Sequence, residues 1–438
     1  MPTVLLIDRD ATSRRATAGL FKHEDWKVLE ASGGDAGIEL ALRDHPEVIL
    51  CDSLMPKENG FHVCRALREQ LHPARIIMVS DQSYSEDRES ALLAGADEYW
   101  VKPVTSNHVA EELERIRPAD ERKGAAKPAC VADVSVATRV KCWGVRGSIP
   151  VPGPSTVRYG GNTSCVEVRA DGEIIVLDAG SGIRGLGIAL EAEFGSNPIC
   201  LSLLLTHSHW DHIQGLPFFL PAYKEKNQIR VLGYEGAQAG LGQILANQME
   251  TPFFPVNMRD LPSNIAIEEL KEMEFEIGRV RVCSKFLNHP GICAGYRLYT
   301  SGGSIAFLPD NEPYERLKMQ DAQRDHAPPD EAKSFAADEH AKLIDFLKGA
   351  SLLMLDTQYT DEEYESHIGW GHGSLTTTID LALEAEIGKL LLFHHDPNHD
   401  DDTVDRMLER ARKYVADRGS SLEVDGAREG AEIVLARG

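Results

Sequence analysis

Four side chains that could bind a metal lie within six consecutive positions of the chain. They are His207, His209, Asp211 and His212. The leucines at 203–205 precede them and indicate the end of a buried strand. Imidazole and carboxylate ligands suit zinc, manganese or iron. A loop directly after a strand would let the first two histidines face one ion and the last two side chains a second. Histidines that gather on a surface by chance are the alternative, and this spacing argues against it.

Two later strands end in side chains of the same kind. The apolar residues 304–309 lead to Asp310, a carboxylate that fits the bridge of a dinuclear site. Residues 389–393 form another buried strand that ends at His394. Because matching strand ends would place ligands together, His394 is the predicted ligand, and the adjacent His395 stays open as the alternative.

The chain from about Val140 to Gly438 resembles the metallo-β-lactamase fold, of which H-x-H-x-D-H is the signature. It looks like the phosphodiesterase branch of that superfamily, with ribonuclease Z as the best-known relative. The resemblance implies that His289, which precedes Gly295-Tyr-Arg297, is a further metal ligand. It also implies that Asp178, at the end of the strand 173–177, orients the histidine loop rather than binding metal.

The predicted centre therefore holds two divalent ions, which would be zinc, manganese or iron. His207, His209 and His289 would bind the first ion. Asp211, His212 and His394 would bind the second. Asp310 and a hydroxide would bridge the two ions. Both ions would keep an open position, as catalytic metals require.

Two further motifs resemble elements of ribonuclease Z that serve phosphate esters. Asp356 ends the apolar strand 352–355 and stands where the relative has a glutamate, so its shorter arm would need a shift or a water. His372 follows Gly371, and the resemblance implies that it lies over the site and pairs with this carboxylate. His372 would contact the phosphate and protonate the leaving oxygen; a surface histidine after a flexible glycine is the alternative. With Asp211, these are the predicted catalytic residues.

Near the amino terminus, four apolar runs each end in polar side chains. The runs cover residues 4–7, 47–51, 75–79 and 98–101. The polar residues that follow them are Asp8 with Asp10, Asp52, Ser80, and Lys102. Strands that alternate with helices indicate a parallel open sheet, whose carboxyl strand ends meet in one ligand-binding crevice.

This segment resembles the receiver domain of two-component response regulators. The resemblance implies one phosphorylation site, with Met55-Pro56 and Gly60 after the acceptor. The implied roles are the phosphoryl acceptor for Asp52, the hydroxyl beside the phosphoryl group for Ser80, the switch aromatic for Tyr99, and the fixed cation for Lys102 before Pro103.

Magnesium binding is the open point of this predicted receiver. The family usually carries adjacent acidic residues after the first strand, whereas here Arg9 separates Asp8 from Asp10. Asp10 could compensate from one position further on. The alternative is a receiver that no longer takes phosphate and acts as a dimerising or docking module.

The length predicts two domains, and the two resemblances imply that both are of α/β class. We expect a (βα)5 receiver at residues 1–118, a linker at 119–138, and an αββα metallo-β-lactamase-fold sandwich at 139–438. The sequence contains no apolar run of about 18 residues, so we expect no membrane span. The first residues enter a strand without a signal-peptide pattern, and the eight cysteines form no C-x-x-C pair. We therefore expect reduced thiols in a cytoplasmic protein.

The formal net charge of −23 opposes binding to nucleic acid, whose affinity comes largely from Lys and Arg. A small anionic substrate remains compatible, because bound metals reverse the local field. The leading hypothesis is a homodimeric response regulator whose dinuclear-metal phosphodiesterase hydrolyses a cyclic nucleotide or cyclic dinucleotide, controlled by a sensor histidine kinase. The alternatives are a nuclease, a thioester or lactone hydrolase, an iron-dependent oxygenase on the same fold, and a non-enzymatic scaffold.

Some features allow two interpretations from the sequence. The Gly-rich turns near 144–165 could serve turn formation alone, or their polar side chains Arg146, Asn162 and Thr163 could face a phosphate. Trp210 could stack on a base or pack over its own loop. Residues 248–255 could line a substrate pocket or pack in the core, and the charged insertion at 311–350 could be a lid or a dimer contact.

Overall fold

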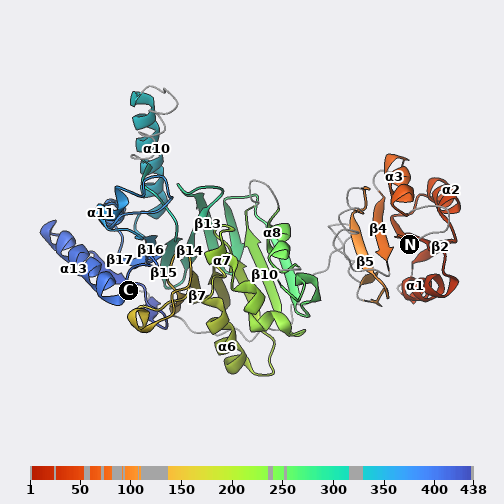
Figure 1. Cartoon of the computed structure of the whole chain (residues 1–438), viewed down its shortest axis with the longest axis horizontal. Helices are drawn as coiled ribbons and strands as arrows, with labels where there is room; N and C mark the ends of the chain where they lie inside the picture. Colours follow the sequence, from red (N-terminus) through yellow and green to blue (C-terminus); the bar gives the residue numbers. More distant parts are fainter. Residues whose placement is uncertain are drawn as a thin grey trace. The chain divides into compact units, whose positions relative to one another are not determined.

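The computed structural model describes residues 2–23, 26–53, 60–70, 74–80, 91, 94–106, 108–109, 137–234, 240–250, 254–314 and 329–435. The chain divides into two compact units, Met1–Lys127 and Pro128–Gly438 (Figure 1). The predicted linker at 119–138 lies almost wholly outside the described residues, so its bounds stay a prediction.

The first unit contains a five-stranded parallel sheet in the order β2-β1-β3-β4-β5. Its strands are β1 (Thr3–Ile7), β2 (Lys27–Ala31), β3 (Val48–Asp52), β4 (Arg75–Ser80) and β5 (Glu98–Val101). Its described helices are α1 (Ala11–His23), α2 (Gly34–Asp44) and α3 (Gly60–Gln70). Leu5 and Ile49 belong to one buried cluster, and Leu6 and Leu50 to another. Burial of both faces explains the continuous apolar runs in the sequence.

The second unit contains two seven-stranded mixed sheets. The first sheet consists, in spatial order, of β11 (Asn264–Glu269), β10 (Gln228–Gly233), β9 (Cys200–Leu204), β8 (Glu173–Leu177), β7 (Cys165–Ala170), β6 (Thr138–Gly144) and β19 (Glu432–Leu435). The second consists of β12 (Glu274–Ile277), β13 (Val280–Phe286), β14 (Ala294–Thr300), β15 (Gly303–Leu308), β16 (Leu352–Asp356), β17 (Lys389–Phe393) and β18 (Glu423–Gly426).

Helices cover the outer faces of the two sheets, and the inner faces pack on each other. Val166 of the first sheet and Phe307 of the second share one buried cluster. The outer helices with residues in the two other clusters are α6 (Ile183–Phe194) and α8 (Leu241–Asn247) on the first sheet, and α10 (Pro329–Leu347), α12 (Leu375–Glu384) and α13 (Asp401–Asp417) on the second. This αββα sandwich and the five-stranded receiver sheet confirm the predicted fold class.

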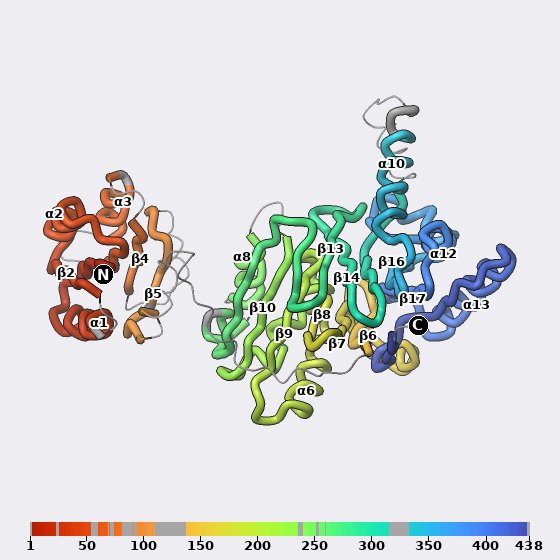
Figure 2. The backbone as a smooth tube through the Cα atoms, turned by 180° about the vertical axis from the view of Figure 1, so that it is seen from behind, coloured from red at the N-terminus to blue at the C-terminus, as the bar shows by residue number. Residues whose placement is uncertain are grey.

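The predicted helix in the insertion 311–350 is present as α10. Leu343 and Leu347 at its carboxyl end join the core of the second sheet, whereas Phe335 near its start is half exposed. The helix extends beyond the sheets in both views (Figures 1 and 2). The insertion's roles as a lid or a dimer contact stay predictions, since residues 315–328 lie outside the described residues.

The ends of parallel strands position the candidate site. His207 follows β9, Asp310 follows β15, Asp356 ends β16, and His394 follows β17. Three of these strands, β15, β16 and β17, are parallel neighbours. Their carboxyl ends therefore lie along one edge of the second sheet, as the pattern of polar strand ends predicted.

Among the described residues, six cysteines are free thiols. Cys200 at the start of β9 is instead disulfide-bonded. The expectation that all eight thiols are reduced is therefore wrong for this position. No helix in the described part of the chain is long and apolar enough to cross a membrane.

Candidate metal centre

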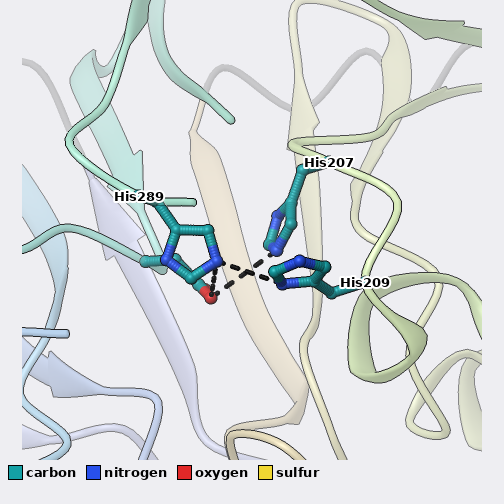
Figure 3. Close-up of side chains that lie close together, drawn as sticks. His207, His209 and His289 are labelled. Carbon is teal, nitrogen blue, oxygen red and sulfur yellow. Dashed lines mark hydrogen bonds and ion pairs between the residues drawn. The ribbon is translucent and has the colours of Figure 1, made fainter. Parts of the chain in front are cut away.

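Three imidazoles and one carboxylate converge at the end of β9. His207, His209, His289 and Asp310 each offer one ligand atom, and these atoms lie within 4.8 Å of one another. Nε2 of His289 lies 3.0 Å from Nδ1 of His209 and 3.5 Å from Oδ2 of Asp310 (Figure 3). Nε2 of His207 lies 3.7 Å from the same oxygen.

Asp211, His212 and His394 form a second group of possible ligand atoms. Oδ2 of Asp211 lies 3.2 Å from Nε2 of His212 and 3.1 Å from Nε2 of His394. The other oxygen of Asp310, Oδ1, lies 3.2 Å and 3.3 Å from the same two nitrogens. Asp310 thus lies between the two groups with one oxygen toward each. All seven sequence-predicted ligands are brought together in this arrangement.

Unpaired buried atoms show that this set of side chains fits metal ions. Nε2 of His207, Nε2 of His212 and Oδ1 of Asp310 are buried and have no hydrogen-bond partner. Leaving such polar atoms unpaired is costly, and divalent cations would satisfy all three. Burial lowers the pKa of His207 well below its usual value, which favours the neutral imidazole that binds metals.

Each of three ligand histidines has a partner for its other ring nitrogen. Nδ1 of His212 donates to Asp178 at 2.7 Å, and Asp178 also accepts from the backbone and the hydroxyl of Thr206. Nδ1 of His289 donates to the carbonyl oxygen of Gly371 at 2.9 Å. Such bonds fix the tautomer and aim Nε2 at the metal. Asp178 therefore lies where the resemblance placed it.

The third such partner is Gln358, which sequence reasoning missed. Its Oε1 lies 3.0 Å from Nδ1 of His394, and its side chain is buried. His394 itself has φ 61°, and its Nε2 lies 3.1 Å from Oδ2 of Asp211. Nε2 of His395 instead donates to the carbonyl oxygen of Ala427 at 3.0 Å, outside the centre. The geometry thus favours His394 over His395. The only local signal for Gln358 was its place two residues after the end of the strand β16.

His372 lies beside the ligands and is held by Asp356. Nδ1 of His372 donates to Oδ2 of Asp356 at 2.9 Å, so the shorter aspartate reaches the imidazole directly. Asp356 is fully buried and also accepts from the backbone nitrogens of Asn311 and Gln358. Burial acts to lower the pKa of His372, but Asp356 outweighs it and raises this pKa to about 9. The ring of His372 stacks on that of His394, with centroids 5.0 Å apart.

The side chains considered as phosphate contacts serve the fold instead. Arg146 is fully buried and donates to the carbonyl oxygens of Gly160, Asp396 and His399. Because its side chain is buried and bonds to three backbone oxygens, Arg146 supports the turn reading rather than a phosphate contact. The other two polar side chains bond to neighbouring segments: Asn162 donates to Glu429, and Thr163 accepts from the backbone nitrogen of Ser181.

Two apolar features are also resolved. Trp210 at the start of α7 (Trp210–Ile213) is 78% exposed, so it does not pack over its own loop. Met249 is buried, and Phe254 packs edge-to-face on Phe218 with ring centroids 5.5 Å apart. Phe254 also borders a pocket that Phe218 and Tyr223 line. Packing is therefore shown for Met249, a substrate role for the segment stays a prediction, and residues 251–253 lie outside the described part.

The receiver unit gathers its predicted site at the ends of β1, β3 and β5. Nζ of Lys102 lies 3.0 Å from Oδ2 of Asp8 and 3.1 Å from Oδ2 of Asp52. Burial acts to raise the pKa of Asp8, but its hydrogen bond with Lys102 outweighs burial and lowers this pKa. The hydroxyl of Ser80 accepts a 2.8 Å bond from Ser53, the neighbour of Asp52, and Tyr99 is buried.

Asp10, the third acidic residue of the predicted receiver site, uses one carboxylate oxygen within its own turn. Its Oδ1 accepts from the backbone nitrogens of Thr12 and Ser13 at the start of α1. This is the bonding of a helix N-cap. Arg9 is exposed. Asp8 and Asp52 both contact Lys102. Met55 and Pro56 lie outside the described residues.

Two family models match the chain. Residues 4–114 match the response regulator receiver domain, and residues 174–333 match the beta-lactamase superfamily domain. Together with the two folds, these matches define the chain as a receiver domain fused to a domain of metallo-β-lactamase fold. Its buried His and Asp groups suggest a metal-dependent hydrolase.

Curated response regulators match about a quarter of this chain. The transcriptional regulatory protein ResD of Bacillus subtilis is 33% identical over 106 residues, which are 24% of this chain and 44% of the relative. CpxR of Escherichia coli is 32% identical over 116 residues, which are 26% of this chain and 49% of the relative. The chain spans about half the length of the curated relatives it matches.

Solved structures resemble the second unit at low identity. YhfI of Bacillus subtilis, a metallo-beta-lactamase fold protein, has a TM-score of 0.48 and 18% identity, covering 68% of this chain and 99% of its own. The short form of human tRNase Z has a TM-score of 0.44 and 17% identity, covering 68% and 100%.

Proposed function

We propose that this protein is a response regulator whose second domain is a dinuclear-metal phosphodiesterase acting on a cyclic nucleotide or cyclic dinucleotide. The observation that carries the proposal is the position of Asp310 between two groups of ligand atoms, with His372 beside them. Paired metal sites bridged by a carboxylate suit in-line displacement at phosphorus. His372 adds a proton donor next to the metal ligands.

The proposed centre would hold one ion on His207, His209 and His289, and a second on Asp211, His212 and His394. Zinc, manganese and iron all accept these ligands. When bound, the two ions supply a nucleophilic hydroxide and neutralise charge on the phosphoryl oxygens.

The chain's own contribution is to hold a proton beside the leaving oxygen. Asp356 fixes Nδ1 of His372, which leaves Nε2 as the donor. The carboxylate of Asp356 favours the protonated form of this imidazole and raises its pKa. A protonated imidazole is the form that a general acid needs.

The surroundings of the centre support a small substrate. Trp210 and Trp370, next to Asp211 and two residues before His372, are 78% and 60% exposed. Exposed aromatic faces near a site offer stacking surfaces for a base. The segments 207–214 and 367–372 contain no Lys or Arg, and the chain carries a net charge of −23. A long polyanion would lack the cations that its backbone requires.

The receiver implies a cognate histidine kinase as its phosphoryl donor. We propose Asp52 as the acceptor, with Lys102 as the fixed cation and Asp8 as a magnesium ligand. Phosphorylation would shift the population of receiver conformations and so control the hydrolase. A homodimer is the proposed form in which this control acts.

The test is product formation from a panel of substrates by the purified full chain with Zn²⁺ or Mn²⁺. The panel contains 3′,5′- and 2′,3′-cyclic mononucleotides, cyclic dinucleotides and a short RNA. Asp211→Asn removes a ligand charge with little change of shape, and Asp417→Asn on the surface is the matched control. Linear nucleotide formed by the control and not by Asp211→Asn supports the proposal.

Other outcomes assign other functions. RNA cleavage alone would make the domain a nuclease. If no phosphodiester is cleaved by protein that carries both ions, the proposal fails. Turnover of a thioester or lactone would then identify a different hydrolase, and a signalling phenotype that survives Asp211→Asn would identify a scaffold.

A further inference from the structure

Glu312 is a buried carboxylate close to the proposed centre that the mechanism above does not use. It lies two residues after Asp310 and is 1% exposed. Its Oε1 accepts from the hydroxyl of Tyr364 at 2.9 Å and from the backbone nitrogen of Gly369 at 2.7 Å. Its Oε2 accepts from the backbone nitrogen of Gly371 at 2.8 Å. These donors are neutral, so the buried charge is stabilised by hydrogen bonds.

The contacts of Glu312 form a closed loop around His289. The backbone nitrogen of Glu312 donates to the carbonyl oxygen of Asn288, and Nδ2 of Asn288 donates back to the carbonyl oxygen of Glu312, each at 2.9 Å. On the other side, the carboxylate holds Gly371, whose carbonyl oxygen accepts from Nδ1 of His289. His289 is therefore fixed through both its chain neighbour and its ring.

The same segment carries His372. Gly369 and Gly371 have φ 92° and 90°, conformations that favour glycine. A Cβ on Gly371 would come within 2.3 Å of Nδ1 of His289, so the loop approaches this ring closely. Without an acceptor for the nitrogens of Gly369 and Gly371, this loop would lose the bonds that hold it against His289 and that set the start of His372.

We propose that Glu312 is a positioning residue that aims His289 at one metal ion and places His372 beside the centre. A carboxylate is required because three donors converge on it from two sides. An amide of the same shape has one acceptor oxygen, and its NH₂ group would face an N–H group of the loop. This inference rests on the proposed metal centre.

The test compares zinc affinities of the full chain, measured by competition with a chromophoric chelator in the absence of substrate. Glu312→Gln should weaken one of the two ions by roughly 10–100-fold, as loss of support for a ligand histidine does. The second ion, held by Asp211, His212 and His394, should weaken by less than about threefold. Tyr364→Phe removes one donor and leaves both glycine bonds, so both affinities should stay within about threefold of wild type. Glu409→Gln, on an exposed helix position, is the matched surface control.

Substitution of cobalt adds a signature that a purely structural role would not move. The visible absorption of one Co²⁺ ion should change in Glu312→Gln and stay unchanged in Tyr364→Phe. Wild-type affinity for both ions in Glu312→Gln would overturn the proposal, and so would an equal weakening of the two ions. If Glu312→Gln does not fold, Glu312→Asp takes its place. Its shorter arm keeps the charge and should still weaken one ion about tenfold, whereas wild-type affinities would overturn the proposal.

Failure of this inference differs from failure of the proposed function. The affinities are measured without substrate, so they report on Glu312 even if no phosphodiester is cleaved. Absence of turnover in wild-type protein that binds both ions would overturn the phosphodiesterase and leave the positioning role in place.

Discussion

At the scale of single residues, Asp310 and His372 each contact two parts of the centre. Asp310 directs one oxygen to each ligand group, and His372 directs one nitrogen to Asp356. The first arrangement concerns metal binding, and the second concerns proton transfer. Substitutions at the two residues should therefore have separable effects.

Asp310→Asn should release metal, because the amide keeps the shape but loses the charge between the two ligand groups. We expect fewer than one bound zinc per chain after dialysis, against two for wild type, measured by elemental analysis. Asp345→Asn, at an exposed position of α10, should retain both ions. Two ions in Asp310→Asn would contradict the assignment of the bridge.

His372→Ala should retain metal and lose turnover. The proposed ligands all remain, so zinc content should equal that of wild type. The loss of a positioned proton donor should lower kcat by about 10²–10⁴-fold. Steady-state kinetics on the cleaved substrate and elemental analysis of the same preparation measure both effects. A parallel loss of zinc would instead make His372 a ligand.

At the scale of elements, loops far apart in the sequence are joined by one buried cation. Arg146 follows β6 and binds carbonyl oxygens of the turn at Gly160 and of the loop after β17. That loop begins at His394. The bonds of Arg146 therefore hold the loop that carries His394, although Arg146 is not itself a proposed metal ligand.

Arg146→Met should destabilise the second unit. The substitution keeps much of the apolar stem but leaves three buried carbonyl acceptors without their donor. A loss of about 3 kcal/mol in the free energy of unfolding is expected, measured by urea denaturation. Arg406→Met on the exposed face of α13 should change stability by less than about 0.5 kcal/mol. Equal stability of the two variants would contradict the stabilising role of Arg146.

At the scale of the whole molecule, the chain consists of two compact units with separate cores. The first unit has an acidic pocket that contains Lys102, and the second has the His and Asp groups that could hold metal ions. Ligands of one unit should therefore stabilise that unit first, by mass action.

Zinc removal should lower the melting temperature of the second unit alone. At about 100 times its dissociation constant, a bound ion adds about 2.7 kcal/mol to the stability of the unit that holds it. Calorimetry of the full chain in magnesium-free buffer, with and without a chelator, measures this. The transition of the receiver should not move, and a common shift of both transitions would contradict independent units.

Phosphorylation should occur at Asp52 and require the magnesium pocket. Acetyl phosphate with Mg²⁺ should add one phosphoryl group to the wild type and none to Asp52→Asn, as measured by intact mass. Asp35→Asn, an exposed position in α2, should be labelled like wild type. No labelling of the wild-type chain would support a receiver that acts only in docking, because Asp10 is engaged as a helix cap.

The sequence by itself determined the chemistry that lies at strand ends. Polar residues directly after apolar runs, such as His207 and Asp310, depend only on local pattern and on the rule that parallel strand ends gather at one edge. The parallel sheet of the first unit followed from the same runs, whereas the sandwich of the second was implied by the resemblance of its motifs. Tertiary structure decided what long-range contacts fix: the choice of His394 over His395, the direct reach of Asp356, and the buried role of Arg146. It also placed Gln358 and Glu312 behind the ligand histidines. No local pattern predicts these, because their partners lie on separate segments and meet only when the sheets pack.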